Sequence, residues 1–60
     1  MLIYEKIKEL CKRKSITVGS LEKQLGFGYG TIRKWENSYP NANNLKKVAD
    51  YFQVSMDYFF

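Results

Sequence analysis

Four side chains near the middle of the sequence share polar groups that could contact a partner: Tyr29, Thr31, Arg33 and Lys34. Their hydroxyl, guanidinium and ammonium groups all donate hydrogen bonds. In the same segment Ile32 and Trp35 are three residues apart, as on one face of a helix. We therefore expect a short helix with an apolar inner face and a donor-rich outer face.

Groups suited to catalysis or to metal binding are sparse in this chain. It has 60 residues, no histidine and one cysteine, Cys11, so the usual nitrogen and sulfur ligands of a zinc site are missing. The acidic residues show no paired spacing typical of an acid–base couple: Glu5, Glu9, Glu22, Glu36, Asp50 and Asp57. We expect a protein that is not an enzyme and has no metal, other cofactor or small-molecule substrate.

The charge balance favours an anionic partner. Ten Lys or Arg against six Asp or Glu give a net charge of +4, which suits nucleic acid or an acidic membrane surface, and also ordinary solubility. No apolar run approaches the ~20 residues of a membrane span, and the N-terminus lacks a signal-peptide core. A single cysteine allows no internal disulfide, which is typical of the reducing cytoplasm. We expect a cytoplasmic protein without a membrane partner.

Hydrophobic periodicity predicts a compact all-α domain of five helices over residues 1–60, and no stretch has a strand pattern. Helices are expected over residues 2–14, 18–25, 28–37 and 42–53, with a last short one after Ser55. Thr17, Asn41 and Ser55 are the predicted N-caps, and Gly26 is the predicted left-handed residue after the second helix. The 60 residues are either a complete domain or the N-terminal part of a longer protein.

The predicted core combines one apolar stripe from each long helix. Its members are Ile3, Ile7, Leu10, Cys11, Val18, Leu21, Leu25, Ile32, Trp35, Leu45, Val48, Ala49 and Phe52. Glu22 is expected outside or at the rim, and Phe27 is expected to fill the turn between the second and third helices. Cys11 is expected to be a small buried hydrophobe.

Glycines alternate along Gly26-Phe27-Gly28-Tyr29-Gly30. A glycine-rich loop that cradles a nucleotide phosphate needs a preceding strand and a βαβ unit. No such strand pattern precedes this run. We therefore interpret it as the turn between two helices.

Taken in order, several short runs resemble the lambda-repressor-like helix-turn-helix family, which includes Cro and the phage repressors. The resemblance covers about residues 6–60, and it is the order and spacing that make it specific. The runs are Lys6-Ile7-Lys8-Glu9-Leu10, Leu21 with Leu25-Gly26, Thr31-Ile32 with Trp35-Glu36, Pro40 with Asn44-Leu45 and Ala49, and Val54-Ser55-Met56-Asp57.

The resemblance implies a transcription regulator, such as a phage or mobile-element repressor, that binds double-stranded DNA. Segment 28–37 would enter the major groove, and a homodimer would read half-sites ~34 Å apart on a two-fold symmetric operator. The expected base-reading residues are Tyr29, Thr31, Arg33 and Lys34. The expected phosphate-contacting residues are Thr17, Gly28, Gly30, Asn37, Asn41 and Asn43, although the asparagines could equally serve as caps and turn residues.

Several positions depart from the family pattern. Val18 stands where a phosphate-gripping glutamine is common, and Glu22 stands where a small alanine is common. Glu22 must therefore lean outward, or the packing must differ. Cys11 replaces the arginine that commonly pairs with the family's glutamate, here Glu36. Gly28 removes a capping hydroxyl, and Gly30 removes a base-reading side chain.

The apolar C-terminal end supports an alternative function. Met56, Tyr58 and Phe60 could form a dimer seam or a docking patch, or they could cover the core, as we expect for Met56 and Phe59. The alternative is a protein-interaction module or an antitoxin on the same fold, with weak or indirect DNA binding.

Overall fold

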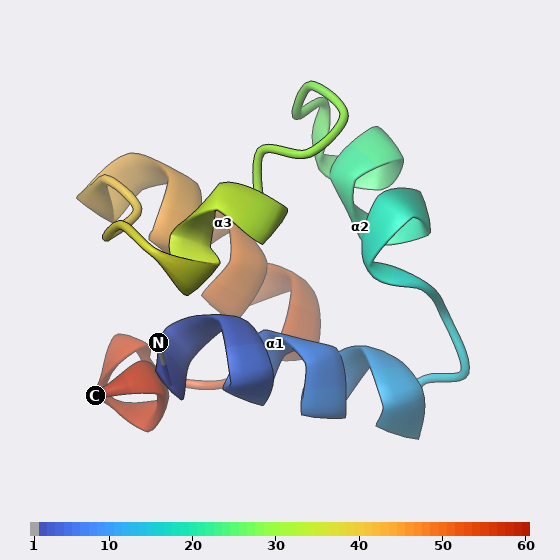
Figure 1. Cartoon of the computed structure of the whole chain (residues 1–60). Helices are drawn as coiled ribbons and strands as arrows, with labels where there is room; N and C mark the ends of the chain where they lie inside the picture. Colours follow the sequence, from blue (N-terminus) through green and yellow to red (C-terminus); the bar gives the residue numbers. More distant parts are fainter. Residues whose placement is uncertain (1) are drawn as a thin grey trace.

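The computed structural model describes residues 2–60 and is helical throughout its regular parts (Figure 1). Its elements in chain order are α1 (Leu2–Arg13), α2 (Val18–Leu25), the 3₁₀-helix η1 (Arg33–Glu36), α3 (Ala42–Phe52) and the 3₁₀-helix η2 (Met56–Phe59). The all-α prediction is confirmed, with no strand among these residues. The count of five helices is not confirmed, because the five elements are three α-helices and two four-residue 3₁₀-helices.

Helix α1 places its predicted apolar stripe in the core. Ile3, Ile7, Leu10 and Cys11 are all buried. Burial raises the pKa of the Cys11 thiol, because an apolar environment disfavours the thiolate. The helix ends where Ser15 takes a left-handed φ of 59° and the Ile16 N–H donates to the Cys11 carbonyl at 3.0 Å. Cys11 is thus a small buried core residue, as expected.

Helix α2 begins and ends at the predicted residues. The Thr17 hydroxyl oxygen accepts a hydrogen bond from the Ser20 N–H at 3.0 Å. Gly26 has a φ of 77°, which glycine adopts without steric cost. The Phe27 N–H then donates to the Glu22 carbonyl at 2.8 Å and closes the helix end. Leu21 is fully buried, whereas Val18 and Leu25 are half-buried.

Helix α3 carries the most regular apolar stripe. The Asn41 side-chain oxygen accepts from the Asn44 N–H at 2.8 Å, which confirms the predicted cap. Leu45, Val48 and Ala49 are buried, and Phe52 is half-buried. The helix stops at Phe52, one residue before the predicted end, because Gln53 adopts a left-handed φ of 57°.

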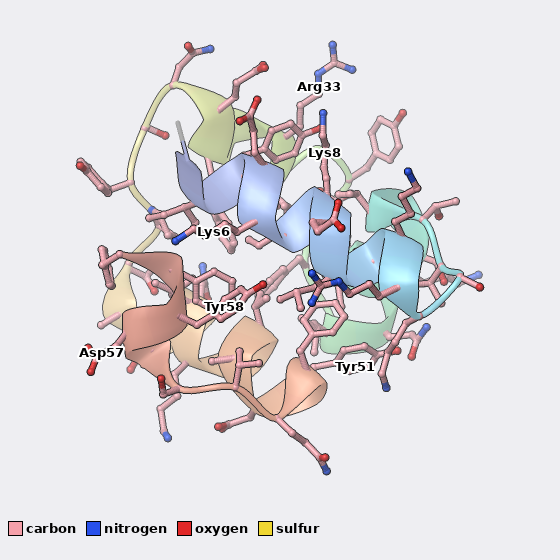
Figure 2. All side chains as sticks on the ribbon, turned by 90° about the horizontal axis from the view of Figure 1, so that it is seen from below. Lys6, Lys8, Arg33, Tyr51, Asp57 and Tyr58 are labelled. Atoms are coloured by element: carbon pink, nitrogen blue, oxygen red, sulfur yellow. The ribbon has the colours of Figure 1, made fainter. Side chains whose placement is uncertain are left out.

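The chain ends in η2, which packs against α1. Ser55 occupies the N-cap position but its side chain makes no capping hydrogen bond, so this predicted cap is wrong. Phe59 is buried and Met56 is half-buried, as expected for residues that cover the core. The Lys6 ammonium donates to the Tyr58 carbonyl oxygen at 2.9 Å and also lies over the Tyr58 ring (Figure 2).

The core joins all five elements around α1, which contacts α2, η1 and η2. In Figure 1 the N- and C-termini lie close together on one side of the molecule, and α2 lies on the other. Segment 28–37 runs between α2 and the loop that leads into α3. Its position is therefore set by packing against α1.

Candidate nucleic-acid interface

Segment 28–37 is not the helix that its pattern predicts. Only Arg33–Glu36 is helical, and it is a 3₁₀-helix preceded by a turn. Gly30 has a left-handed φ of 84°, which an α-helix cannot include. The Thr31 N–H donates to the Gly28 carbonyl at 3.1 Å, and the Trp35 N–H donates to the Ile32 carbonyl at 2.9 Å. The Lys34 N–H donates to the Gly30 carbonyl at 3.2 Å, so the segment mixes three-residue turns with one four-residue turn.

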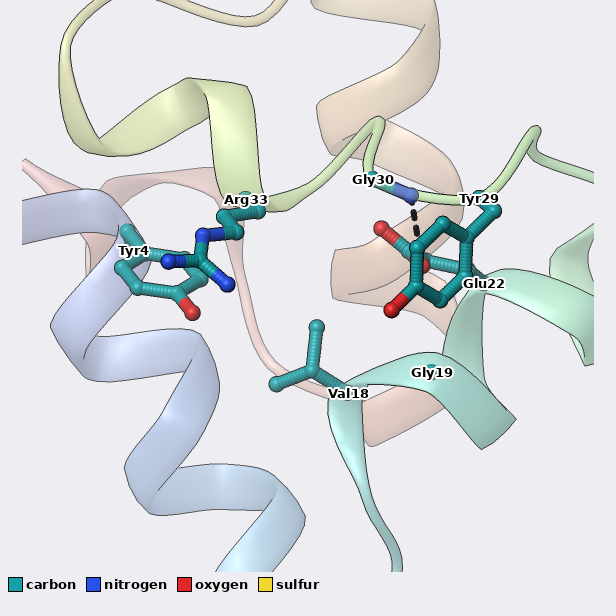
Figure 3. Close-up of a pocket in the computed structure, with 7 residues that line it drawn as sticks. All are labelled: Tyr4, Val18, Gly19, Glu22, Tyr29, Gly30 and Arg33. Carbon is teal, nitrogen blue, oxygen red and sulfur yellow. Dashed lines mark hydrogen bonds between the residues drawn. The ribbon is translucent and has the colours of Figure 1, made fainter.

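The prediction that Glu22 lies outside or at the rim is wrong, because its side chain is buried. It is only 3% exposed. Its Oε1 accepts from the Gly30 N–H at 3.1 Å, the contact drawn in Figure 3, and its Oε2 accepts from the Ile32 N–H at 2.8 Å. The departure from the family's alanine was the one sequence signal for this role. The carboxylate therefore accepts two amides near the start of the segment, where a helix has no acceptor of its own.

Two apolar anchors hold the segment to the core. Ile32 and Trp35 are buried, which confirms their prediction as the inward pair. Phe27 packs edge-on against Trp35, with ring centroids 6.0 Å apart, and the Lys47 ammonium lies 5.8 Å from the Phe27 ring centroid. Phe27 therefore fills the turn as predicted, and it links α3 to the segment.

The predicted base-reading side chains differ in solvent exposure. Tyr29 is 98% exposed, so it does not fold back over Ile32 or Phe27. Arg33 and Lys34 are also exposed, whereas Thr31 is half-buried. Figure 3 shows Tyr29 and Arg33 on opposite sides of a hollow, with the guanidinium group beside the Tyr4 ring.

This hollow separates α1 and α2 from segment 28–37. It holds about 200 Å³ and is lined by Tyr4, Val18, Gly19, Glu22, Tyr29, Gly30 and Arg33. Val18 contributes only methyl groups to it (Figure 3). Both Glu22 oxygens are engaged by backbone amides, which leaves the Arg33 guanidinium as the cation at the rim. Such a surface can receive an anion or a polar base edge.

Most other cations are occupied within the fold. Four lysines lie over aromatic rings: Lys6 over Tyr58, Lys8 over Tyr4, Lys14 over Tyr51 and Lys47 over Phe27. Two further cations form i,i+4 ion pairs, Arg13 with Glu9 at 3.6 Å and Lys46 with Asp50 at 3.7 Å. Within residues 2–60, Arg33 and Lys34 have neither kind of partner. The cations available to an external anion therefore include the two on the segment.

The predicted phosphate-contacting residues lie at element ends. Thr17 and Asn41 use their side-chain oxygens as caps, which leaves the Thr17 O–H and the Asn41 NH₂ to donate elsewhere. Gly28, Asn37 and Asn43 are exposed. The Gly30 N–H already donates to Glu22, so it is not available to a phosphate.

No helix within residues 2–60 is long and apolar enough to cross a membrane. In the same part of the chain, no group of three or more His, Cys, Asp or Glu residues is placed to hold a metal ion.

Comparison with known proteins returns one result that covers nearly the whole chain. A family model described as helix-turn-helix matches residues 7–59. No curated protein and no solved structure matches the chain significantly. The matched range extends from α1 to η2 and includes the whole of segment 28–37.

Proposed function

Because the chain belongs to the lambda-repressor-like helix-turn-helix family, we propose that it is a sequence-specific transcription regulator in the cytoplasm. The family is one of DNA-binding transcription regulators. Within it, we assign this chain to the repressors of phages or mobile elements. It would bind double-stranded DNA as a homodimer and block access of polymerase to the occupied operator.

One observation carries this proposal: the most exposed large hydrophobic side chain of the described residues, Tyr29, shares its segment with two unpaired cations. Lys34 donates to guanine O6 or N7, and Arg33 binds a phosphate or pairs with guanine in bidentate form. The Tyr29 ring lies against a thymine methyl. The half-buried Thr31 reaches a base edge or a phosphate at shorter range.

The phosphate contacts would flank this segment. The Thr17 hydroxyl donates from the start of α2, and the Asn41 amide donates from the start of α3. Asn37, Asn43 and Gly28 complete the set. We leave the Gly30 amide out of it, because Glu22 already accepts its hydrogen bond.

The dimer seam would lie at the C-terminal end. Phe60 is 70% exposed, and Met56 and Tyr58 are half-buried beside it. A second copy would cover these apolar surfaces and place two reading segments on one face of the DNA. Half-sites about one helical turn, ~34 Å, apart follow from that geometry.

The test is selection of bound sequences from random double-stranded DNA, followed by footprinting. We expect a two-fold symmetric site and an affinity that falls with salt, with a log–log slope of about −0.9 per phosphate neutralised. Failure to enrich any sequence would refute specific recognition.

The base-reading role of Lys34 has a matched control. Lys34→Ala and Lys46→Ala each remove one positive charge, but Lys46 lies on α3 and pairs with Asp50. We expect Lys34→Ala to lower the ratio of operator to random-DNA affinity by about tenfold, and Lys46→Ala to leave it unchanged. An equal loss on both DNAs would assign Lys34 to a phosphate instead.

Two observations favour a second candidate, a protein-interaction module or antitoxin. The reading segment contains only a four-residue 3₁₀-helix, and Phe60 is largely exposed after η2. Sedimentation discriminates between the two functions. A chain that stays monomeric at high concentration and binds no DNA would favour the second candidate.

A further inference from the structure

Glu22 is the one polar or charged residue that is buried among the described residues. Burying a carboxylate is costly unless its oxygens are hydrogen-bonded. Here both oxygens accept backbone N–H groups from segment 28–37. The cost of burial is therefore offset only while the segment keeps its present conformation.

The two amides that donate to Glu22 lie between the displayed residues Tyr29 and Arg33. Gly30 directly follows Tyr29, and Ile32 directly precedes Arg33. A Cβ atom built at Gly30 would meet nothing within 4 Å, so Gly30 itself has no side-chain contact that fixes the bend. The buried Ile32 anchors the segment two residues later, and backbone hydrogen bonds from Thr31 to Gly28 and from Lys34 to Gly30 lie within it. The two hydrogen bonds to Glu22 are the ones that join the bend to α2.

We infer that Glu22 is the positioning residue of the DNA-reading segment. Its carboxylate fixes the backbone between Tyr29 and Arg33 from outside the segment. Selectivity for a DNA sequence then depends on an anion in α2 that never touches the DNA. This inference rests on the proposed function and names the group that makes the segment selective.

The direction in which Glu22→Gln changes the affinity for DNA distinguishes a positioning role for Glu22 from a simple effect of net charge. Glu22→Gln raises the net charge by one, and a more positive chain binds phosphate more tightly. The glutamine oxygen can accept one amide, but its NH₂ group then faces the other donor. Positioning therefore predicts weaker binding to the selected DNA, whereas charge alone predicts stronger binding.

The experiment compares Glu22→Gln with Glu5→Gln, an exposed substitution on α1 with the same charge change. Affinities for the selected DNA and for random DNA are measured at one salt concentration. We expect the affinity of Glu22→Gln for the selected DNA to be about tenfold lower than that of Glu5→Gln. The two variants should bind random DNA with equal affinity. Amide hydrogen exchange should show faster exchange at Gly30 and Ile32 in Glu22→Gln alone.

General destabilisation needs its own control. Val48→Ala weakens the core within α3, away from the segment, and should leave the ratio of selected to random affinity unchanged in the folded protein. Should Glu22→Gln fail to fold, Glu22→Asp retains the charge but shortens the reach by one methylene. We expect it to reduce selectivity without changing net charge.

The outcomes separate the two proposals. If the wild type selects DNA and Glu22→Gln binds it as tightly as Glu5→Gln does, the positioning role is refuted and the proposed function stands. Rapid exchange of the Gly30 and Ile32 amides in the wild type would also refute the role. If the wild type selects no DNA, the proposed function fails and the role fails with it, even when both amides are protected.

Discussion

Helix α3 and segment 28–37 are of similar length, and both have inward residues at helical spacing, yet they fold differently. Ala42–Phe52 forms a complete α-helix with a side-chain cap. Segment 28–37 forms one 3₁₀-helix of four residues. Both bury their apolar residues, with Leu45 in the first and Ile32 in the second almost fully covered. Burial pattern and backbone conformation are therefore separate properties of a segment.

The two segments also differ in what accepts the hydrogen bonds of their first amides. At the start of α3 the Asn44 N–H donates to the cap residue of the same helix. In segment 28–37 the N–H groups of Gly30 and Ile32 donate to Glu22 on α2. Both arrangements supply acceptors that a helix start lacks, so the backbone difference lies in the left-handed φ of 84° at Gly30, which an α-helix cannot include.

The largest expected effect tests whether the two segments are anchored equally. Leu45→Ala and Ile32→Ala each remove a fully buried side chain, and each should lower the free energy of unfolding by about 2–5 kcal/mol. Denaturant unfolding measures both. A loss below about 1 kcal/mol for Ile32→Ala would show that segment 28–37 is not tied to the core as α3 is.

The second prediction tests the left-handed bend. Gly30→Ala forces a Cβ into a φ of 84° and should cost about 1–2 kcal/mol. Gly28→Ala is the matched control, because Gly28 lies outside the left-handed region and its Cβ would meet the Thr31 hydroxyl at an ordinary 3.6 Å. It should change stability by less than about 0.5 kcal/mol. If Gly30→Ala and Gly28→Ala lowered the thermal unfolding midpoint equally, the left-handed bend at Gly30 would be contradicted.

The third prediction concerns the caps. Asn41→Ala removes the hydrogen bond to the Asn44 N–H and should cost about 1 kcal/mol. Ser55→Ala removes a hydroxyl that makes no capping bond and should be close to neutral. Helicity by circular dichroism and the unfolding midpoint check both. A sizeable loss in Ser55→Ala would place a cap where the structure has none.

The smallest effect tests the exposed surface of α3. The Lys46–Asp50 pair is 3.7 Å apart, with side chains 69% and 68% exposed. Asp50→Asn should therefore cost only about 0.3 kcal/mol, and this difference should vanish in 1 M salt. If the loss is larger and independent of salt, Asp50 contributes to α3 through something other than this pair.

Local sequence signals predicted much of this structure. Thr17, Gly26 and Asn41 were identified as helix boundaries, because capping chemistry acts over three or four residues. Inward positions such as Val48 and Trp35 followed from spacing alone. Ser55 failed as a cap because its hydroxyl makes no capping hydrogen bond, although its backbone carbonyl accepts from the Tyr58 N–H.

The candidate site was predictable in composition but not in conformation. Tyr29, Arg33 and Lys34 follow from the pattern as the residues that the core leaves outside. Glu22 could not be assigned in the same way, because eight residues separate it from Gly30 and ten from Ile32. Hydrophobic periodicity reports only which side of a segment faces inward, and it contains no information about a donor and acceptor on different elements.

The local sequence thus encodes helical content, helix ends and buried apolar residues, since each depends on neighbours a few positions apart. The excess of cations follows from composition alone. The bend at Gly30, the burial of Glu22 and the full exposure of Tyr29 arise only when α2 and segment 28–37 pack together on α1. A glycine tolerates many backbone conformations. It takes one conformation here because a carboxylate on another helix accepts its amide.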